Sequence, residues 1–403
     1  MKTTEIDEAT MACRDPCTSS GLSAPRRSIP FAVAWPSSAG GARAFRVILL
    51  KATNVLGLPG HKRATSRSGK EFDPVFKCGT VSIQIWHRSY AFKNGPFKIG
   101  QRVRSAVDAI EVAICRHDRC GRGECVPYPR YGESLEAIVA QIRQLPVGVT
   151  RANLTNLLRS GPARNALDCA LCDLEAKHAG RRVWELAELN APGPVDTMVS
   201  ISNGTAAEMA EEADRYSRKH RQLKLFLTNP DVLSMVSAIH EAAPNCDLII
   251  DAAESWDIET YITLAPKLAR MNVVLIEQPL PAGKDSALAG IGHPVPICAD
   301  ESCRGIFAVS RLKERYDFIN IKLDNAGGLT AALALREAER KEGLGIMIGS
   351  TIGSSLAIAP AVLLAQDAEF IDLDGPLLLE EEHEAALLYE GGSVHPARVM
   401  LWG

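Results

Sequence analysis

The fold is decided by a series of short apolar runs that each end in an ionisable residue: Leu248-Ile-Ile-Asp251, Val273-Val-Leu-Ile-Glu277, Val295-Pro-Ile-Cys-Ala-Asp300 and Phe318-Ile-Asn-Ile-Lys322. Three more runs of strand length belong to the series, and stretches with helical spacing separate them. The additional runs are 223–227, 344–349 and 370–374, and the helical stretches include 231–243, 258–270 and 329–341. Strands and helices that alternate every 22–28 residues or so are typical of βα units on a parallel sheet. Seven in succession favour a closed (β/α) barrel over a doubly wound sheet.

The segment before the barrel has a different pattern. Alternating runs at Val81–Trp86 and Val107–Cys115 predict strands, and Gly121–Ser134, rich in turn residues and aromatics, predicts a loop. Helical stretches then follow to about residue 190. One of them, residues 163–180, ends at Gly180, a favoured residue at helix C-termini. Strands followed by helices indicate a small α+β domain.

Residues 1–78 differ in composition from the rest. They carry 12 Lys and Arg against 6 Asp and Glu, a charge of +6, whereas the remaining 325 residues carry −9. Because their Ser/Pro/Gly/Arg-rich text has no sustained periodicity, we expect a poorly ordered N-terminal extension. The other expected segments are an α+β domain over 79–190, a barrel over 191–380, and a C-terminal segment over 381–403 that packs back toward the α+β domain.

The overall composition is that of a soluble globular protein, with 46% hydrophobic and 23% charged residues among 403. The net charge of −3 provides no general attraction to nucleic acid or to an anionic membrane. Since no run of 18 apolar residues and no secretory signal pattern occurs, we expect a cytoplasmic protein. The alternative, a transit peptide, is disfavoured by four acidic residues near the start, Glu5, Asp7, Glu8 and Asp15.

The eleven cysteines are too sparse for a disulfide scaffold. Cys169 and Cys172 resemble half of a zinc site, but they lie in a helical pattern without a second pair, which favours small buried helix residues. Cys115, Cys120 and Cys125 are not linked to a histidine cluster either. We therefore expect a reducing compartment and free thiols.

Three of the strand-terminal residues are acids on consecutive strands: Asp251, Glu277 and Asp300. In a parallel barrel the C-terminal strand ends surround one site, where three carboxylates would repel one another unless a cation joined them. Oxygen donors without His or Cys fit Mg²⁺ better than zinc. The alternative is a set of helix N-caps in the loops after the strands, where Asp is common.

Lys322 follows the third acid by one βα unit and would face the same site. A neighbouring divalent cation disfavours the charged form of a lysine and lowers its pKa, so that it can act as a general base. Its alternative is a surface lysine. Asp372 and Asp374 are two residues apart, so they would share a strand face, where they could hold an ammonium group.

Six motifs, in conserved order and spacing, resemble one known family. They are Gly123-Glu-Cys-Val-Pro-Tyr-Pro-Arg-Tyr-Gly-Glu-Ser134, Ala163-Arg-Asn-Ala-Leu-Asp-Cys-Ala-Leu-Cys-Asp-Leu174, Ile276-Glu-Gln-Pro-Leu280, Ile297-Cys-Ala-Asp-Glu-Ser302, Ile319-Asn-Ile-Lys-Leu-Asp324 and Asp372-Leu-Asp374. From about residue 80 to residue 390, the chain resembles the enolase superfamily, and within it the dipeptide epimerases. The resemblance implies a capping domain over a modified (β/α)₇β TIM-like barrel, with Mg²⁺ on Asp251, Glu277 and Asp300.

The resemblance also implies a reaction and its residues. Such enzymes move the proton α to a carboxylate from one face of a dipeptide to the other, with two lysines as base and acid. Lys322 matches one of these lysines. Asp372 and Asp374 match the pair that holds the dipeptide ammonium, and Arg104 lies where an arginine for a glutamate side chain can occur.

The sequence departs from the family at three positions near the site. In the second barrel strand the family has Lys-x-Lys, and here Lys224 matches the first lysine while Phe226 replaces the second. Ala253 stands where the family usually has Asn, and Met198 where many members have Thr. Three explanations remain open: Lys224 serves as a substitute base, Lys322 works alone, or the protein binds without turnover.

The sequence thus predicts a Mg²⁺-dependent isomerase that resembles dipeptide epimerases and acts on a dipeptide such as L-Ala-D/L-Glu. The alternatives are a one-base lyase or cycloisomerase of the same superfamily, and a non-catalytic protein that binds small molecules. The expected partner is a small-molecule substrate, not nucleic acid or a membrane. A homo-oligomer remains an open alternative.

Overall fold

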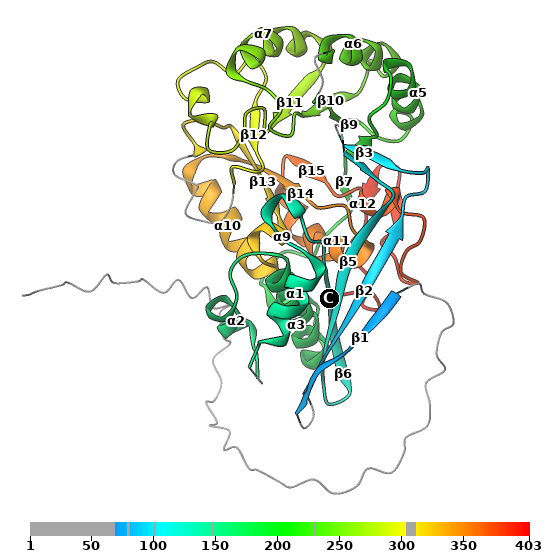
Figure 1. Ribbon diagram of the computed structural model, residues 1–403, viewed down its shortest axis with the longest axis vertical. Coiled ribbons are helices and arrows are strands. Elements are labelled where there is room, and N and C mark those ends of the chain that lie inside the picture. Colours follow the sequence, from blue (N-terminus) through cyan, green and yellow to red (C-terminus); the bar gives the residue numbers. More distant parts are fainter. Residues whose placement is uncertain (1–68, 79–80, 100–101, 147, 229–230, 304–311) are drawn as a thin grey trace, which may run out of the picture. The chain divides into compact units, whose positions relative to one another are not determined.

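The structure is a computed structural model that describes residues 69–78, 81–99, 102–146, 148–228, 231–303 and 312–403. The part of the predicted extension that spans residues 1–68 lies outside the described residues. Two sheets dominate the described chain, a four-stranded antiparallel sheet and an eight-stranded parallel sheet (Figure 1). No helix among the described residues is long and apolar enough to cross a membrane.

The N-terminal α+β domain, the cap, is built on the antiparallel sheet in the order β1-β2-β5-β6. Its strands are β1 (Gly69–Cys78), β2 (Val81–Ala91), β5 (Ala106–Arg116) and β6 (Arg119–Cys125), and a separate hairpin joins β3 (Phe97–Ile99) to β4 (Arg102–Arg104). The cap helices are η1 (Pro129–Tyr131), α1 (Leu135–Arg143), α2 (Arg151–Leu157), α3 (Pro162–Ala179) and α4 (Val183–Leu186). The sheet begins at Gly69, ten residues before the expected boundary at residue 79. The edge strand β1 contains Pro74, and a proline within a run of residues argues against a strand in sequence analysis, although edge strands tolerate it.

The predicted loop at Gly121–Ser134 is wrong in its first part, because β6 extends to Cys125. Two glycines gave this strand the appearance of a loop. A Cβ on Gly121 would lie 2.1 Å from the Ala170 oxygen, and one on Gly123 would lie 2.2 Å from the Ala166 oxygen. The glycines therefore let the backbone of helix α3 approach the sheet closely, which is a packing requirement and not a turn signal.

The parallel sheet confirms the predicted barrel. Its strand order is β15-β14-β13-β12-β11-β10-β9-β8, and the backbone N–H of Met198 donates to the Ile371 oxygen at 2.9 Å, which links the two ends of the series. The strands are β8 (Val199–Ile201), β9 (Gln222–Phe226), β10 (Asp247–Asp251), β11 (Val273–Glu277), β12 (Ile297–Ala299), β13 (Phe318–Lys322), β14 (Gly345–Gly349) and β15 (Phe370–Asp372). Each of the seven predicted strands is present, and β8 precedes them. The modified TIM-like barrel with an α+β cap is therefore the observed fold.

Helices lie outside the barrel strands, as Figure 1 shows for α5, α6 and α7 beside β9, β10 and β11. The helices are α5 (Ala206–Ser217), α6 (Val232–Ala242), α7 (Ile258–Leu268), η2 (Ala269–Met271), η3 (Asp285–Leu288), α9 (Leu323–Ala326), α10 (Leu329–Glu342), α11 (Ser355–Leu364), η5 (Ala365–Asp367) and α12 (Gly375–Leu378). A small sheet unites β7 (Val195–Asp196), β16 (Tyr389–Glu390) and β17 (Ser393–Val394). The strands present one apolar face to the helices and another to the barrel interior, where Met198, Ile249, Leu275, Cys298 and Met347 pack together.

The C-terminal residues pack on the cap helices. The indole N–H of Trp402 donates to the Cys169 oxygen at 3.0 Å, and the N–H of Gly403 donates to Asp173 Oδ1 at 2.9 Å. The guanidinium of Arg182 bonds to the Ala397 oxygen at 2.7 Å. Trp402 is almost fully buried, so the chain end contributes to the core between cap and barrel.

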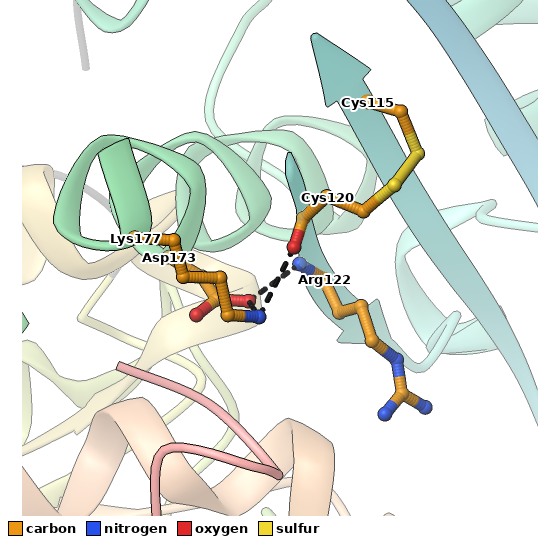
Figure 2. Close-up of a disulfide and its surroundings, with 5 residues drawn as sticks. All are labelled: Cys115, Cys120, Arg122, Asp173 and Lys177. Atoms are coloured by element: carbon orange, nitrogen blue, oxygen red, sulfur yellow. Dashed lines mark hydrogen bonds and ion pairs between the residues drawn. A yellow bond between two sulfur atoms is a disulfide. The ribbon is translucent and has the colours of Figure 1, made fainter. Parts of the chain in front are cut away.

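The expectation of free thiols is wrong for one pair, because Cys115 and Cys120 form a disulfide (Figure 2). The two residues face each other across β5 and β6, a cross-strand pairing that cysteine spacing along the chain does not indicate. Lys177 of α3 donates to the Cys120 oxygen at 3.0 Å and pairs with Asp173 at 2.7 Å. Six cysteines are free and buried: Cys125, Cys169, Cys172, Cys246, Cys298 and Cys303.

Candidate active site

The C-terminal ends of the barrel strands bring the predicted acids and lysines together. The ammonium group of Lys224, on β9, is buried among three carboxylates. Its Nζ lies 3.1 Å from Asp251 Oδ2, 2.7 Å from Glu277 Oε2 and 2.8 Å from Asp372 Oδ2. Residues from β9, β10, β11 and β15 therefore meet at one end of the barrel, as the strand-end pattern predicted.

Lys322, at the end of β13, belongs to the same cluster. Its Nζ lies 2.5 Å from Asp300 Oδ2 and 4.0 Å from Glu277 Oε1. The side-chain amide of Asn320 donates to Glu277 Oε1 at 2.7 Å. Sequence reasoning missed Asn320, although it precedes Lys322 by two residues and so shares its strand face.

Charge and burial shift the pKa values in this cluster. Burial, together with the charge of Glu277, raises the pKa of Asp251 to about 7. Burial acts in the same direction on Glu277, but Lys224 and Lys322 overcome it and hold the pKa of Glu277 at about 2. Burial opposes the charged form of both lysines, yet the surrounding carboxylates raise each lysine pKa well above its usual range. Without a metal ion, both lysines are therefore held as ammonium groups.

The strand-end carboxylates fit Mg²⁺ as ligands, although in this structure they pair with Lys224 and Lys322. Within the described residues, no three acidic, histidine or cysteine side chains surround a common ion position. Asp251, Glu277, Asp300 and Asp372 nonetheless bring four carboxylates against two ammonium groups, an excess of negative charge that suits a divalent cation. The buried Asp300 Oδ1 also has no hydrogen-bond partner. All-oxygen donors with an unsatisfied carboxylate oxygen are appropriate ligands for Mg²⁺.

Asp372 and Asp374 are both buried but have different partners. Asp372 binds Lys224, whereas Asp374 Oδ2 accepts a hydrogen bond from the backbone N–H of Ser200 at 2.6 Å. The strand β15 ends at Asp372, so strand alternation does not extend to Asp374. Burial and the charge of Asp372 raise the pKa of Asp374 to about 7.

Phe226 lies at the end of β9, four strands away from Lys322 in an eight-stranded order. The two residues are therefore on opposite sides of the barrel. The Phe226 ring packs in an apolar cluster with cap residues, and its centroid lies 6.3 Å from that of Phe97 in an edge-to-face arrangement. Lys224 Nζ lies 5.3 Å from the Phe226 ring centroid. An apolar cluster thus lies at the end of β9, on the side of the barrel opposite Lys322.

Arg104 lies in the same hairpin as Phe97, directly opposite it in the β3–β4 register. Its guanidinium carbon lies 5.9 Å from the centroid of the Tyr128 ring, which belongs to the Gly123–Ser134 motif. Arg104 therefore belongs to the part of the cap that contacts the barrel at Phe226. Among the described residues, no ion pair of Arg104 with the strand-end carboxylates is present.

The other two departures have separate environments. Met198 is fully buried in the barrel interior and does not reach the strand ends. The backbone N–H of Ala253 donates to Asp251 Oδ1 at 2.9 Å, so this position supports an acid through its main chain. Two more charged residues near the site were not predicted: burial and Asp300 raise the pKa of Glu301 to about 9, and Glu254 forms a short ion pair with Arg130 of the cap.

Comparison with known proteins identifies the family. Residues 208–398 match the family model described as enolase C-terminal domain-like. The chain is 41% identical to L-Ala-D/L-Glu epimerase of Escherichia coli K12 over 305 residues, which cover 74% of this chain and 95% of that protein.

Solved structures agree with this match. An enolase family member from Agrobacterium tumefaciens with homology to dipeptide epimerases, bound to sodium and L-Ala-L-Glu, has 42% identity and a TM-score of 0.78, covering 80% of this chain and all of that chain. A dipeptide epimerase from Methylococcus capsulatus, complexed with Mg and L-Arg-D-Lys, has 26% identity and a TM-score of 0.71, covering 78% of this chain and 96% of that chain. The chain therefore belongs to the dipeptide epimerase family of the enolase superfamily.

Proposed function

We propose that this protein is a Mg²⁺-dependent isomerase that removes the proton α to the carboxylate of a dipeptide such as L-Ala-D/L-Glu. One observation carries the proposal: Lys322 Nζ lies 2.5 Å from Asp300 Oδ2, within a group of acids at the strand ends. The relative with 41% identity is an L-Ala-D/L-Glu epimerase. A proton-transferring amine next to oxygen donors for a divalent cation is the arrangement that such chemistry requires.

In this proposal Asp251, Glu277 and Asp300 hold Mg²⁺. The bound ion supplies positive charge that stabilises the developing negative charge on the substrate carboxylate. Lys322 takes the α-proton as a neutral amine, which requires its pKa to fall from the raised value that its carboxylate partners impose. A cation held by Asp300 and Glu277 would favour that change, because it would offset the negative charge that keeps Lys322 protonated.

The remaining residues bind or position the substrate. We assign the substrate ammonium group to Asp372 and Asp374, which are buried carboxylates near the end of β15. We assign Arg104 to an acidic side chain of the second amino acid, because it is a cap arginine close to Tyr128. The neighbouring acids of Lys224 keep it charged, so we assign it to charge balance at the metal site.

Phe226 favours a second candidate function, one-base chemistry. Inversion at the α-carbon needs a proton donor on the face opposite the base, and a phenylalanine cannot donate a proton. Lys224 does not replace it, because same-face strand residues lie about 6–7 Å apart and its ammonium is held by three carboxylates. Lys322 would then exchange the α-proton on one face, or catalyse a lyase or cycloisomerase reaction. A non-catalytic small-molecule binder is the third candidate.

Proton NMR in D₂O with Mg²⁺ separates these candidates. L-Ala-L-Glu and L-Ala-D-Glu are incubated separately with the protein, and the α-proton signal of the glutamate residue is followed. Interconversion with deuterium uptake from both isomers supports the epimerase. Exchange from one isomer without inversion supports one-base chemistry. Absence of exchange from both isomers contradicts the catalytic proposal for these substrates and leaves the binder.

We further propose a cytoplasmic location and leave a homo-oligomer as an open alternative. The free, buried thiols from Cys125 to Cys303 are compatible with a reducing compartment, whereas the Cys115–Cys120 disulfide is not typical of one. Cell fractionation with an immunoassay for the protein would test the location. Recovery in the cytosolic fraction supports it, and recovery in another fraction contradicts it.

A further inference from the structure

Helix α3 of the cap contacts the loop that follows Lys322. This loop, 323–330, contains the short helix α9 and joins β13 to helix α10. Three neighbouring side chains of α3, Arg164, Asn165 and Asp168, are buried, with exposed fractions of 8%, 2% and 4%. Burying polar groups of this kind destabilises the folded state unless they are hydrogen-bonded. The partners of these side chains therefore show which segments they hold in place.

Each of the three side chains bonds to a different part of the loop. Asn165 Nδ2 donates to Asp324 Oδ1 at 2.7 Å, two residues after Lys322. Arg164 donates to the Ala326 oxygen at 2.6 Å and to the Gly327 oxygen at 3.0 Å, at the C-terminal end of α9. Asp168 Oδ2 accepts from the backbone N–H of Thr330 at 2.9 Å, in the first turn of α10. A cation at a helix C-terminus and a carboxylate at a helix N-terminus both match the helix dipole.

The loop backbone is shaped to fit these side chains. Gly327 and Gly328 have φ values of 85° and 112°, in the left-handed region that favours glycine. A Cβ on Gly327 would lie 2.4 Å from Arg164 Nε, and a Cβ on Gly328 would lie 2.4 Å from the Asp168 Cβ. The loop therefore lies against α3 with no space for a side chain between them.

The barrel itself holds the end of β13 on one side only. Towards β14, the pairing continues to Lys322 opposite Gly349. Towards β12, the described pairs are Cys298 with Phe318 and Ala299 with Ile319, so the ladder stops three residues before Lys322. The backbone of Lys322 then continues directly into α9, for which it is the N-terminal capping residue. Contacts to the loop therefore help to fix the backbone position of Lys322, from which its side chain extends.

We propose that Arg164, Asn165 and Asp168 are positioning residues that set the location of the Lys322 amino group through the loop 323–330. The inference rests on the proposed function of Lys322 as the proton-transferring group. It gives the cap a part in proton transfer that is separate from substrate binding. A displacement of the reacting group by about 1 Å can reduce a rate about 100-fold, so a loosened loop lowers kcat and leaves substrate affinity largely unchanged.

Two variants of the full-length protein and one control test this role. Asn165→Leu removes the bond to Asp324, and Arg164→Lys keeps the positive charge but loses the planar pair of donors. Lys177→Met is the control on the same helix, because Lys177 bonds to Cys120 and Asp173 and not to the loop. We measure kcat and KM for α-proton exchange in L-Ala-L-Glu, and amide hydrogen exchange of peptides over 322–330.

Both test variants are expected to lower kcat about 10- to 100-fold, with KM within about twofold of wild type. They also accelerate amide exchange in the loop, and Lys177→Met changes neither quantity. The inference is overturned if kcat and loop exchange in Asn165→Leu equal those of wild type, or if Lys177→Met causes the same loss. If Asn165→Leu does not fold, Arg164→Lys decides the question by the same criteria.

The two readouts separate this inference from the proposed function. A wild-type protein without any α-proton exchange, in the presence of Mg²⁺, contradicts the proposed function. Amide exchange then still tests whether α3 holds the loop, since that measurement needs no turnover. Unchanged loop exchange in both variants overturns the positioning role even if the wild-type protein is active.

Discussion

Phe97 of the cap and Phe226 of strand β9 lie edge to face, with their ring centroids 6.3 Å apart. Phe226 and Lys322 lie on opposite sides of the barrel, because β9 and β13 are four strands apart in an order of eight. One side of the proposed reaction site therefore carries an amine and the other an aromatic wall. This asymmetry determines which reactions the site supports, and it is the basis of the first two predictions.

Phe226→Lys is expected to raise the epimerisation rate of L-Ala-L-Glu by at least about tenfold, because it restores a proton donor opposite Lys322. The measurement is the growth of the second isomer by NMR. Phe226→Met is the matched control, since it changes the shape of the wall without adding a titratable group. Equal rates in wild type and Phe226→Lys would mean that residue 226 does not face the reacting carbon.

Lys322→Met is expected to reduce α-proton exchange about 10²- to 10⁴-fold, the usual contribution of a positioned general base. Methionine preserves much of the side-chain length and removes the amine. Because Lys322 is not an oxygen donor, Mg²⁺ binding measured by calorimetry should persist in this variant. Exchange at the wild-type rate would remove Lys322 from the mechanism.

Mg²⁺ is expected to stabilise the protein, since an ion that binds the folded state shifts the unfolding equilibrium. At a free concentration 100 times the dissociation constant, the gain is about 2.7 kcal/mol. Thermal unfolding with EDTA and with Mg²⁺ measures the effect. Asp300→Asn should reduce it, because the variant removes the charge of the carboxylate whose Oδ1 has no hydrogen-bond partner. An equal Mg²⁺ shift in Asp300→Asn would contradict the assigned ligands.

Glu339 on α10 predicts a pH-dependent stability that is unrelated to the site. Its carboxylate is fully buried, and neither oxygen has a hydrogen-bond partner among the described residues. Burial, with a contribution from Glu342, raises its pKa to about 8. The folded state then retains a proton that the unfolded state loses near pH 4.5, so this residue costs stability progressively as the pH rises from about 4.5 to 8.

The variant Glu339→Gln removes that cost. Its free energy of unfolding should match that of wild type near pH 4.5 and exceed it by roughly 1–4 kcal/mol at pH 8, because each unit of pKa shift corresponds to about 1.4 kcal/mol. Urea unfolding at several pH values measures the difference. Glu342→Gln serves as a control for the neighbouring charge. A constant difference across this pH range would show that Glu339 does not titrate as stated.

Hydrophobic periodicity was sufficient to predict the barrel. Apolar runs such as Val273–Glu277 and Phe318–Lys322 coincide with the observed strands β11 and β13, because a strand buried on both faces needs a continuous apolar run. The ionisable residues at the strand ends then met as expected, since parallel strands bring their C-terminal ends to one edge. Local pattern and topology were enough for Asp251, Glu277, Asp300 and Lys322, whereas Lys224 was expected at the site only from the family resemblance.

Other features depend on contacts between distant segments, which a single sequence does not reveal. Gly121 has the composition of a loop residue, but it is required in strand β6 because the backbone of α3 lies too close for a side chain. The bond between Asn165 and Asp324 joins residues 159 positions apart. The Cys115–Cys120 pairing follows from the register of β5 and β6 and not from cysteine spacing. Asp372 and Asp374 were expected to share a strand face, but β15 ends at Asp372 and the two carboxylates have different partners.

Deuterium uptake at the glutamate α-carbon of L-Ala-L-Glu is the most direct test of the central claim, that Lys322 transfers the substrate α-proton beside a Mg²⁺ site. The measurement compares wild type with Lys322→Met in D₂O, with Mg²⁺ present and after EDTA treatment. The account predicts uptake only for wild type with Mg²⁺. Uptake that persists in Lys322→Met, or no uptake from either glutamate isomer with wild type and bound Mg²⁺, would contradict it.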